Sequence, residues 1–165
     1  PQKNQELLID AFNIVSNKHK DMVLKIFGEG SLKKKLQNRI DELGLKDKVY
    51  LMGTKSDVLN WIKESYCFVL TSDFEGLPNS LIEAMCMGIP CISTDCSPGG
   101  ARQLLGADRG LIVPCRDKER LAEAINMYLE QRHIAMQYGE EAYKLRDEVE
   151  SHTVAKEWIN LIEKL

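Results

Sequence analysis

The sequence has 165 residues, of which 44% are hydrophobic and 28% are charged. These proportions fit one globular domain over residues 1–165, and they exclude a disordered, collagen-like or disulfide-scaffold chain. The net charge of −3 argues against general binding to nucleic acid or to anionic membranes. Because the chain begins at Pro1 and enters a helical pattern at once, we expect it to be part of a larger protein.

Helical patterns and short apolar runs alternate along the chain. The helical patterns predict helices over residues 5–18, 32–43, 56–64, 78–87, 98–105, 117–130, 131–145 and 151–165. The apolar runs predict strands over residues 22–27, 49–52, 66–70, 89–94 and 110–113. These runs do not alternate with polar residues, which is typical of a parallel sheet covered on both faces. We therefore expect an α/β fold with a helical C-terminal end.

The sequence has no apolar run long enough to span a membrane, and no signal peptide opens it. An odd number of cysteines, five, indicates free thiols in a reducing cytosol. Cys86, Cys91 and Cys96 are spaced by five residues, whereas zinc sites usually use tighter pairs. We interpret these cysteines as small buried hydrophobic residues.

Ligands of a parallel sheet bind at the carboxyl ends of its strands, so the loops after the strands carry the candidate site. After the third strand, the segment Glu75-Gly-Leu-Pro-Asn-Ser-Leu-Ile-Glu83 has acids on both sides of a helix start. Free N–H groups at such a start favour phosphate, and Glu83 can accept hydrogen bonds from a ribose diol. Residue types alone slightly favour another interpretation, in which Glu75 is a solvated loop acid and Glu83 is a helix acid that complements the dipole.

Two other enzyme classes are disfavoured. Eight residues of helix span about 12 Å, whereas glycosidase acid pairs lie about 5 to 9.5 Å apart, which favours two separate sugar contacts. The turn Gly28-Glu29-Gly30 suggests a dinucleotide site, but Lys33 occupies the third glycine position of that fingerprint. The three histidines lie outside the candidate loops, and no G-x-S-x-G motif is present.

The segment Glu75 to Glu83 resembles the E-x7-E motif of retaining glycosyltransferases with the two-domain GT-B architecture, the group 1 family. Its continuation, Gly88-Ile-Pro-Cys-Ile-Ser-Thr-Asp95, is similar to the family's next strand. Gln2-Lys-Asn-Gln5 resembles the segment after the family's glycine–arginine turn, and 23–30 resembles its strand and G-x-G turn. The similarity covers nearly the whole chain. It implies a Rossmann-like parallel sheet, the C-terminal donor-binding half of a GT-B fold, with an N-terminal acceptor domain outside this sequence.

The resemblance implies a role for each matching residue. Glu75 would lie near the donor hexose as the catalytic acid, Glu83 would hold the ribose hydroxyls, and Lys3 would neutralise the diphosphate. The other implied donor contacts are Gly28, Gly30, Thr54, Lys55, Gly76, Leu77, Asn79 and Ser80. Where the family often has an acid after two glycines, this sequence has Gln103, so that contact is not carried over.

The implied activity is transfer of a hexose, with retention, from a nucleotide-diphosphate sugar to a polysaccharide, lipid-linked or lipopolysaccharide precursor. A UDP-sugar is the favoured donor. The sequence lacks an Asp-x-Asp motif, and we expect no metal or other cofactor. The expected partners are the donor and the acceptor domain, at the cytoplasmic face of the cell membrane, and the isolated domain should be inactive. Two alternatives stay open: a non-catalytic nucleotide-sugar-binding subunit and a GT-B sugar-nucleotide epimerase.

Overall fold

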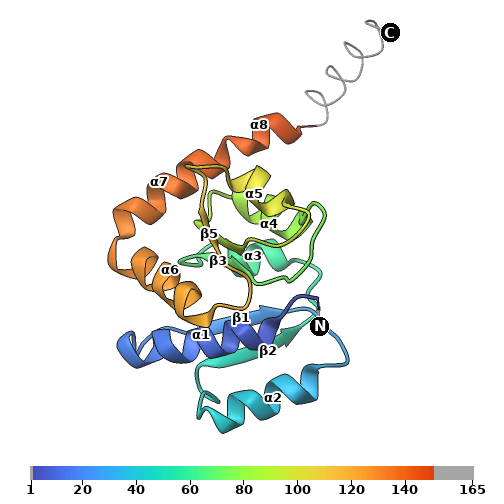
Figure 1. The fold of residues 1–165 in the computed structure, drawn as a ribbon, viewed down its shortest axis with the longest axis vertical. Helices are drawn as coiled ribbons and strands as arrows, with labels where there is room; N and C mark the ends of the chain where they lie inside the picture. Colours follow the sequence, from blue (N-terminus) through green and yellow to red (C-terminus); the bar gives the residue numbers. More distant parts are fainter. Residues whose placement is uncertain (1, 151–165) are drawn as a thin grey trace, which may run out of the picture.

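The computed structural model describes residues 2–150, in which strands and helices alternate (Figure 1). The strands are β1 (Leu24–Phe27), β2 (Val49–Gly53), β3 (Phe68–Leu70), β4 (Cys91–Thr94) and β5 (Leu111–Val113). The helices are α1 (Gln5–Lys18), α2 (Lys33–Glu42), α3 (Val58–Ile62), α4 (Asn79–Cys86), α5 (Gly100–Leu105), α6 (Lys118–Glu130), α7 (Arg132–Tyr143) and α8 (Leu145–Val149). The helix expected over 151–165 lies outside the described residues.

The strands pair in parallel within two sheets. β1 pairs with β2, with Leu24 beside Val49. β4 lies between β3 and β5, and its Ile92 is flanked by Val69 and Leu111. The expected parallel α/β class is therefore confirmed, and the structure adds that the strands are divided between two sheets.

Helices cover both faces of the strands and form two hydrophobic cores. On one face, α1, α2 and α6 pack over Ile26, Ile92 and Val113. On the other face, α3, α4 and α5 pack over Leu70 and Cys91. All residues of β4 are buried, because alternate side chains enter opposite cores. Burial on both faces fits the largely apolar β3, β4 and β5, whereas β1 and β2 each leave one residue exposed, Lys25 and Tyr50.

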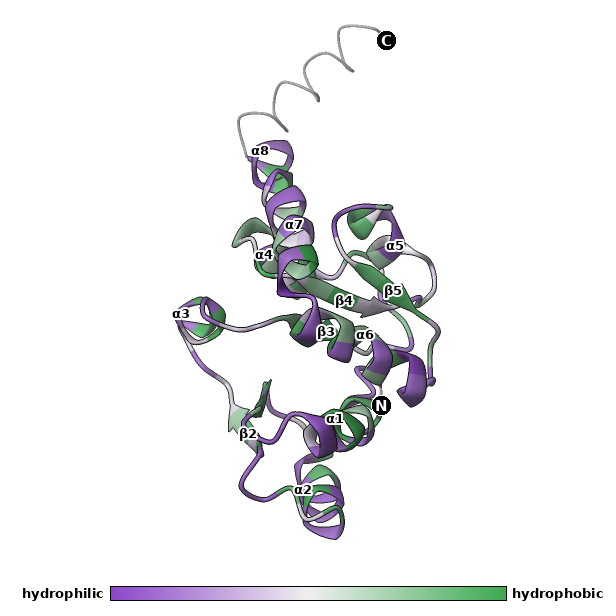
Figure 2. Ribbon diagram, turned by 90° about the vertical axis from the view of Figure 1, so that its left-hand side faces the viewer, coloured by the Kyte–Doolittle hydropathy of each residue, from purple (hydrophilic) through white to green (hydrophobic). Residues whose placement is uncertain are grey.

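A groove of about 660 Å³ lies between β1 and β3. Figure 2 shows β2, α1 and α2 on one side of it and the sheet of β3, β4 and β5 on the other. Apolar side chains form much of its wall, among them Phe12, Ile26, Val69 and Ile125. Within residues 2–150, β1 pairs only with β2, and β3 pairs only with β4. The groove thus lies between an unpaired edge of β1 and an unpaired edge of β3.

Helix ends follow local signals in the sequence. Gly44 has a φ of 68° just after α2, as expected for a helix stop. The side chains of Asp57 and Asp117 accept hydrogen bonds from backbone N–H groups at the starts of α3 and α6. The helix expected over 131–145 ends at Tyr143, and α8 follows directly because Lys144 keeps helical backbone angles.

Candidate functional site

The loops after the strands meet at the carboxyl edge of the two sheets. The loops after β1 and β2 touch, since the Gly28 N–H donates to the Gly53 carbonyl at 2.9 Å. The loops after β3 and β4 also touch, because the Glu75 N–H donates to the Ser97 carbonyl at 3.0 Å. Lys3, in the turn before α1, borders both the groove and a second hollow of about 250 Å³ beside Gly28. The N-terminal turn therefore stands between the two pairs of loops.

Glu75 is the best enclosed of the predicted site acids, with 12% of its side chain exposed. Its Oε1 atom accepts a hydrogen bond from Ser72 Oγ at 3.0 Å and lies 2.5 Å from Lys3 Nζ. The Lys3 side chain is 51% exposed, so its ammonium stays accessible to a ligand. The structure thus brings together two predicted site residues that are 72 positions apart.

The backbone around Lys3 is fixed to the loop after β3. Thr71 Oγ1 donates to the Lys3 carbonyl at 2.9 Å, and the Asp73 N–H donates to the Gln2 carbonyl at 2.8 Å. Gln2 Nε2 in turn donates to the Phe74 carbonyl at 2.9 Å. These bonds hold the N-terminal turn so that Lys3 points at residues 71–77, the loop after β3 that carries Glu75 and is called the acid loop below.

Asp73 is a part of this edge that the sequence analysis missed. Its carboxylate accepts hydrogen bonds from Asn4 Nδ2 at 3.1 Å and from Arg116 Nη2 at 3.1 Å. Burial acts to raise the pKa of Asp73, but the hydrogen bonds from Arg116 and Asn4 hold that pKa below its ordinary value. Asp73 and Arg116 carry opposite charges, and each follows a predicted strand. This combination was the signal that could have revealed their contact.

Helix α4 starts at the same edge. Its N-cap is Pro78, whose side chain has no hydrogen-bonding group, so the N–H groups of Asn79 and Ser80 are left without intrahelical partners. Ser80 and the exposed Glu83 border the groove together with Lys3. The helix is anchored by its buried residues, Leu81, Ala84 and Met85.

The other predicted donor contacts are more scattered. Gly28 and Gly30 border the second hollow. Gly76, Leu77 and Asn79 are exposed on the acid loop and at the start of α4.

Two predicted residues lie apart from this cluster. Thr54 and Lys55 are exposed after β2 and border neither hollow, and Lys55 Nζ lies 5.3 Å from the ring centroid of Trp61. The structure therefore gathers Lys3, Glu75, Ser80 and Glu83, but it does not bring Thr54 and Lys55 to them.

The segment 97–100, which follows β4, supports the acid loop. Phe74 and Ser97 form a parallel bridge. A Cβ on Gly100 would lie 1.8 Å from the Gly76 carbonyl oxygen, so only glycine permits this contact. The loop that carries Glu75 therefore rests directly on the start of α5.

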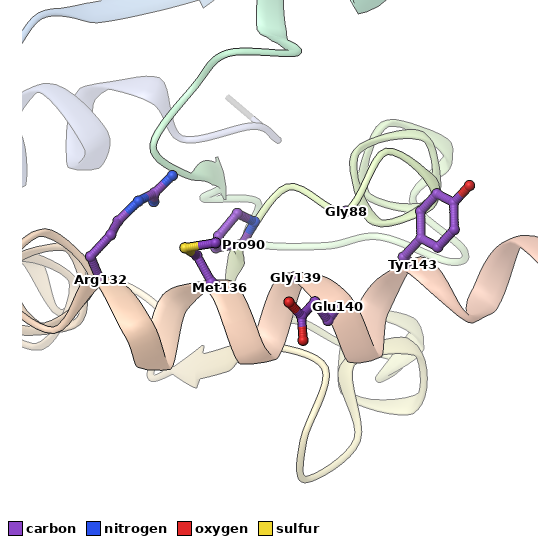
Figure 3. A pocket seen from close by; sticks show the side chains of 7 residues that line it. All are labelled: Gly88, Pro90, Arg132, Met136, Gly139, Glu140 and Tyr143. Atoms are coloured by element: carbon purple, nitrogen blue, oxygen red, sulfur yellow. The ribbon is translucent and has the colours of Figure 1, made fainter.

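A further hollow, of about 360 Å³, lies at the amino end of β4 (Figure 3). Arg132, Met136 and Tyr143 project from α7 around Gly88 and Pro90, which precede the strand. Because it opens at the opposite end of β4, this hollow is separate from the carboxyl edge.

Within residues 2–150, no three His, Cys, Asp or Glu side chains are grouped so as to hold a metal ion. The five cysteines are free thiols, with Cys91 and Cys96 buried and Cys86 half-buried. Burial raises the pKa of the Cys67 thiol to about 12. The same residues include no helix that is both long enough and apolar enough to cross a membrane.

Comparison with known proteins identifies the family. The model of the family described as glycosyl transferases group 1 matches residues 1–145. An exopolysaccharide phosphotransferase of Streptomyces coelicolor is 32% identical over 166 residues, which cover 100% of this chain and 18% of that protein. An N-acetylgalactosamine-N,N'-diacetylbacillosaminyl-diphospho-undecaprenol 4-alpha-N-acetylgalactosaminyltransferase of Campylobacter jejuni is 33% identical over 141 residues, which cover 85% of this chain and 38% of that enzyme.

Solved structures share the fold. A Staphylococcus aureus TarM mutant, crystallised with UDP and two other compounds, is 25% identical with a TM-score of 0.88, covering 98% of this chain and 33% of TarM. Anabaena HepE in complex with UDP is 22% identical with a TM-score of 0.89, covering 100% of this chain and 46% of HepE. The chain thus spans less than half the length of each of these four proteins. The expected Rossmann-like α/β fold of GT-B glycosyltransferases is confirmed, and the chain belongs to the glycosyl transferases group 1 family.

Proposed function

We propose that the chain is the donor-binding domain of a retaining glycosyltransferase that transfers a hexose from a nucleotide-diphosphate sugar to an acceptor. The observation that carries this proposal is the placement of Lys3 beside Glu75 and the start of α4. A diphosphate at this edge would meet the Lys3 ammonium and the free N–H groups of Asn79 and Ser80. Family membership supports the transferase activity.

The same groups suit the chemistry of the leaving nucleotide. Breaking the bond between sugar and phosphate leaves negative charge on the nucleoside diphosphate. The Lys3 cation and the start of α4 would stabilise this charge, so we propose that transfer needs no metal or other cofactor. Lys3 would then be shared between Glu75 and the diphosphate, which keeps the acid next to the reacting sugar.

Each remaining site residue has a role within this proposal. The exposed carboxylate of Glu83 would accept hydrogen bonds from the ribose hydroxyls, and Glu75 would act next to the hexose. Backbone N–H groups after β3 would contact the hexose and the diphosphate; these belong to Gly76, Leu77, Asn79 and Ser80. The loops after β1 and β2 would lie along the nucleoside, with Gly28 and Gly30 in the first loop and Thr54 and Lys55 in the second.

Relatives support the substrate classes. TarM was crystallised with UDP, which favours a UDP-sugar as the donor here. The names of the Streptomyces and Campylobacter proteins point to exopolysaccharide and to a diphospho-undecaprenol-linked sugar. We therefore propose a polysaccharide or lipid-linked acceptor, bound by a separate N-terminal domain at the cytoplasmic face of the membrane.

The groove between β1 and β3 supports a longer domain than this sequence. Gly28, after β1, and Thr71, after β3, both lie close to Lys3, so the two strands end at the same edge of the fold. A strand ending at that edge would lead directly into α1 and would bury the apolar wall of the groove. We propose that residues preceding Pro1 in the full protein supply this strand, followed upstream by the acceptor domain.

Calorimetric titration of the chain with UDP, GDP and ADP tests the donor site. We expect weak binding overall, with UDP the tightest of the three nucleotides. Glu83→Ala should lower the affinity for UDP about tenfold or more, because a charge-assisted hydrogen bond to the ribose is lost. Glu140→Ala, which removes an exposed helical acid beside the hollow of Figure 3, should leave binding unchanged. The proposal is overturned if no nucleotide binds and Glu83→Ala leaves transfer by the intact enzyme unaffected.

Product analysis with the intact enzyme separates the alternatives. A transferase should move sugar only when an acceptor is present, and Glu75→Gln should abolish that transfer. Conversion of the donor sugar without an acceptor would identify an epimerase instead. Nucleotide binding without either reaction would identify a non-catalytic binding subunit.

A further inference from the structure

Two non-glycine residues among residues 2–150 have left-handed backbone angles: Asn4, with a φ of 40°, and Arg116, with a φ of 62°. Both donate hydrogen bonds to the carboxylate of Asp73. Such a backbone conformation is unfavourable for arginine, although asparagine adopts it more readily, and it persists where the surrounding contacts impose it. Both left-handed residues thus contact one carboxylate, and the backbone of Arg116 is the unfavourable one.

Asp73 holds the chain on both sides of Lys3. Its backbone N–H donates to the Gln2 carbonyl at 2.8 Å, and its Oδ1 atom accepts from Asn4 Nδ2 at 3.1 Å. Arg116, from the loop after β5, bonds the other carboxylate oxygen, Oδ2. The two neighbours of Lys3 are therefore tied to a residue whose carboxylate is also held by Arg116.

Stability alone does not account for Arg116 at this position. Its side chain is 75% exposed, and exposed ion pairs contribute little to folding free energy. Its left-handed backbone opposes folding, and glycine would adopt the same φ without strain. A role in positioning other groups explains why Arg116 forms this ion pair despite its unfavourable backbone conformation.

We propose that Asp73, Arg116 and Asn4 form a clamp that positions Lys3 for a nucleoside diphosphate. This inference rests on the proposed function. Within it, Asp73 and Arg116 are positioning residues that act through Lys3 rather than through contact with the donor.

Two substitutions at Arg116 separate positioning from stability. Arg116→Ala and Arg116→Gly both remove the donor to Asp73, but only glycine relieves the backbone strain. We expect the glycine variant to melt about 2–4 °C above the alanine variant. Both should bind UDP about threefold to tenfold more weakly than the wild type in calorimetry. The inference is overturned if the glycine variant binds UDP as the wild type does.

Arg109→Ala is the matched control. Arg109 forms a comparable two-contact ion pair with Glu148, but it lies before β5, at the opposite end of that strand. Its removal should lower the melting temperature without changing UDP affinity. An equal loss of affinity in this variant would show that binding merely follows stability.

A double-mutant cycle tests whether the clamp acts through Lys3. In a Lys3→Ala background, Arg116→Ala should cause no further loss of UDP affinity. A loss as large as in the wild-type background would contradict the inference.

Hydrogen exchange at the Asp73 amide keeps the two proposals distinguishable. We expect faster exchange in both Arg116 variants, because the hydrogen bond from the Asp73 N–H to the Gln2 carbonyl loosens. This should hold even for the glycine variant, which is the more stable of the two. If the wild type binds no nucleotide, the proposed function fails, whereas unchanged exchange at Asp73 would refute the clamp.

Discussion

At the residue scale, the position of the loop that carries Glu75 depends on a glycine in the next loop. A Cβ on Gly100 would lie 1.8 Å from the Gly76 carbonyl oxygen, and because that oxygen is backbone, the acid loop must move. We expect Gly100→Ala to destabilise the fold by about 1–3 kcal/mol. We also expect it to lower UDP affinity, because Glu75 and Lys3 are displaced from each other. Thermal unfolding and calorimetry measure the two effects.

Gly139→Ala provides the comparison for this prediction. A Cβ on Gly139 would lie 2.3 Å from the Gly88 carbonyl oxygen, a similar conflict beside the hollow of Figure 3. This variant should be destabilised as well, yet its folded form should bind UDP like the wild type. Equal losses of affinity in the two variants would mean that the acid loop is not part of the donor site.

Motif spacing predicted part of the candidate site and missed the rest for a physical reason. Glu75 and Glu83 were predicted from the residues of one continuous segment, and Ser80 and Lys3 from the family resemblance. The structure places them together. The contacts of Asp73 with Asn4 and Arg116 depend on how three distant segments pack, and no local pattern encodes that packing.

At the element scale, local chemistry predicted where helices begin better than where strands begin. The helices expected over 56–64 and 117–130 begin at or next to Asp57 and Asp117, and the side chains of these two residues cap α3 and α6. The strand over 66–70 was expected to begin two residues before β3, because the apolar run starts before the residues that pair with β4. Pairing, unlike capping, is decided by a partner far along the chain.

The caps themselves give a prediction for stability. Asp117 Oδ1 accepts the Arg120 N–H at 2.9 Å at the start of α6, a helix of 13 residues that packs on α1. Asp117→Ala should therefore cost about 1 kcal/mol in denaturant unfolding. Asp57→Ala should cost less, because its bond to the Asn60 N–H is 3.4 Å long and α3 has only 5 residues. The reverse order would contradict this assignment of the caps.

At the scale of the whole molecule, the fold class could be predicted but the sheet arrangement could not. Apolar runs indicated buried parallel strands, and the two cores on either side of β4 confirm that interpretation. The order of strands within a sheet leaves no such trace, because each run records only that both of its faces are buried. The separation of β1 from β3 therefore became visible only in the structure.

The proposed strand in the groove between β1 and β3 can be tested by extending the chain before Pro1. A five-residue run of valine and isoleucine, joined through two linking residues, should enter the groove and bury apolar surface against Ile26 and Val69. We expect the melting temperature to rise by about 4 °C or more. Backbone amides of β1 and β3 should also exchange more slowly.

The matched control for this extension carries proline at its central position. Proline has no backbone N–H to donate to a neighbouring strand. A strand placed between two others must form hydrogen bonds along both of its edges. This version should therefore leave the melting temperature and the exchange at β1 and β3 unchanged. If both extensions stabilise equally, the gain comes from nonspecific apolar contact, and the groove is not the place of a missing strand. If the extension without proline slows exchange only at β1 and β3, and the proline version does not, the two sheets are halves of one continuous sheet.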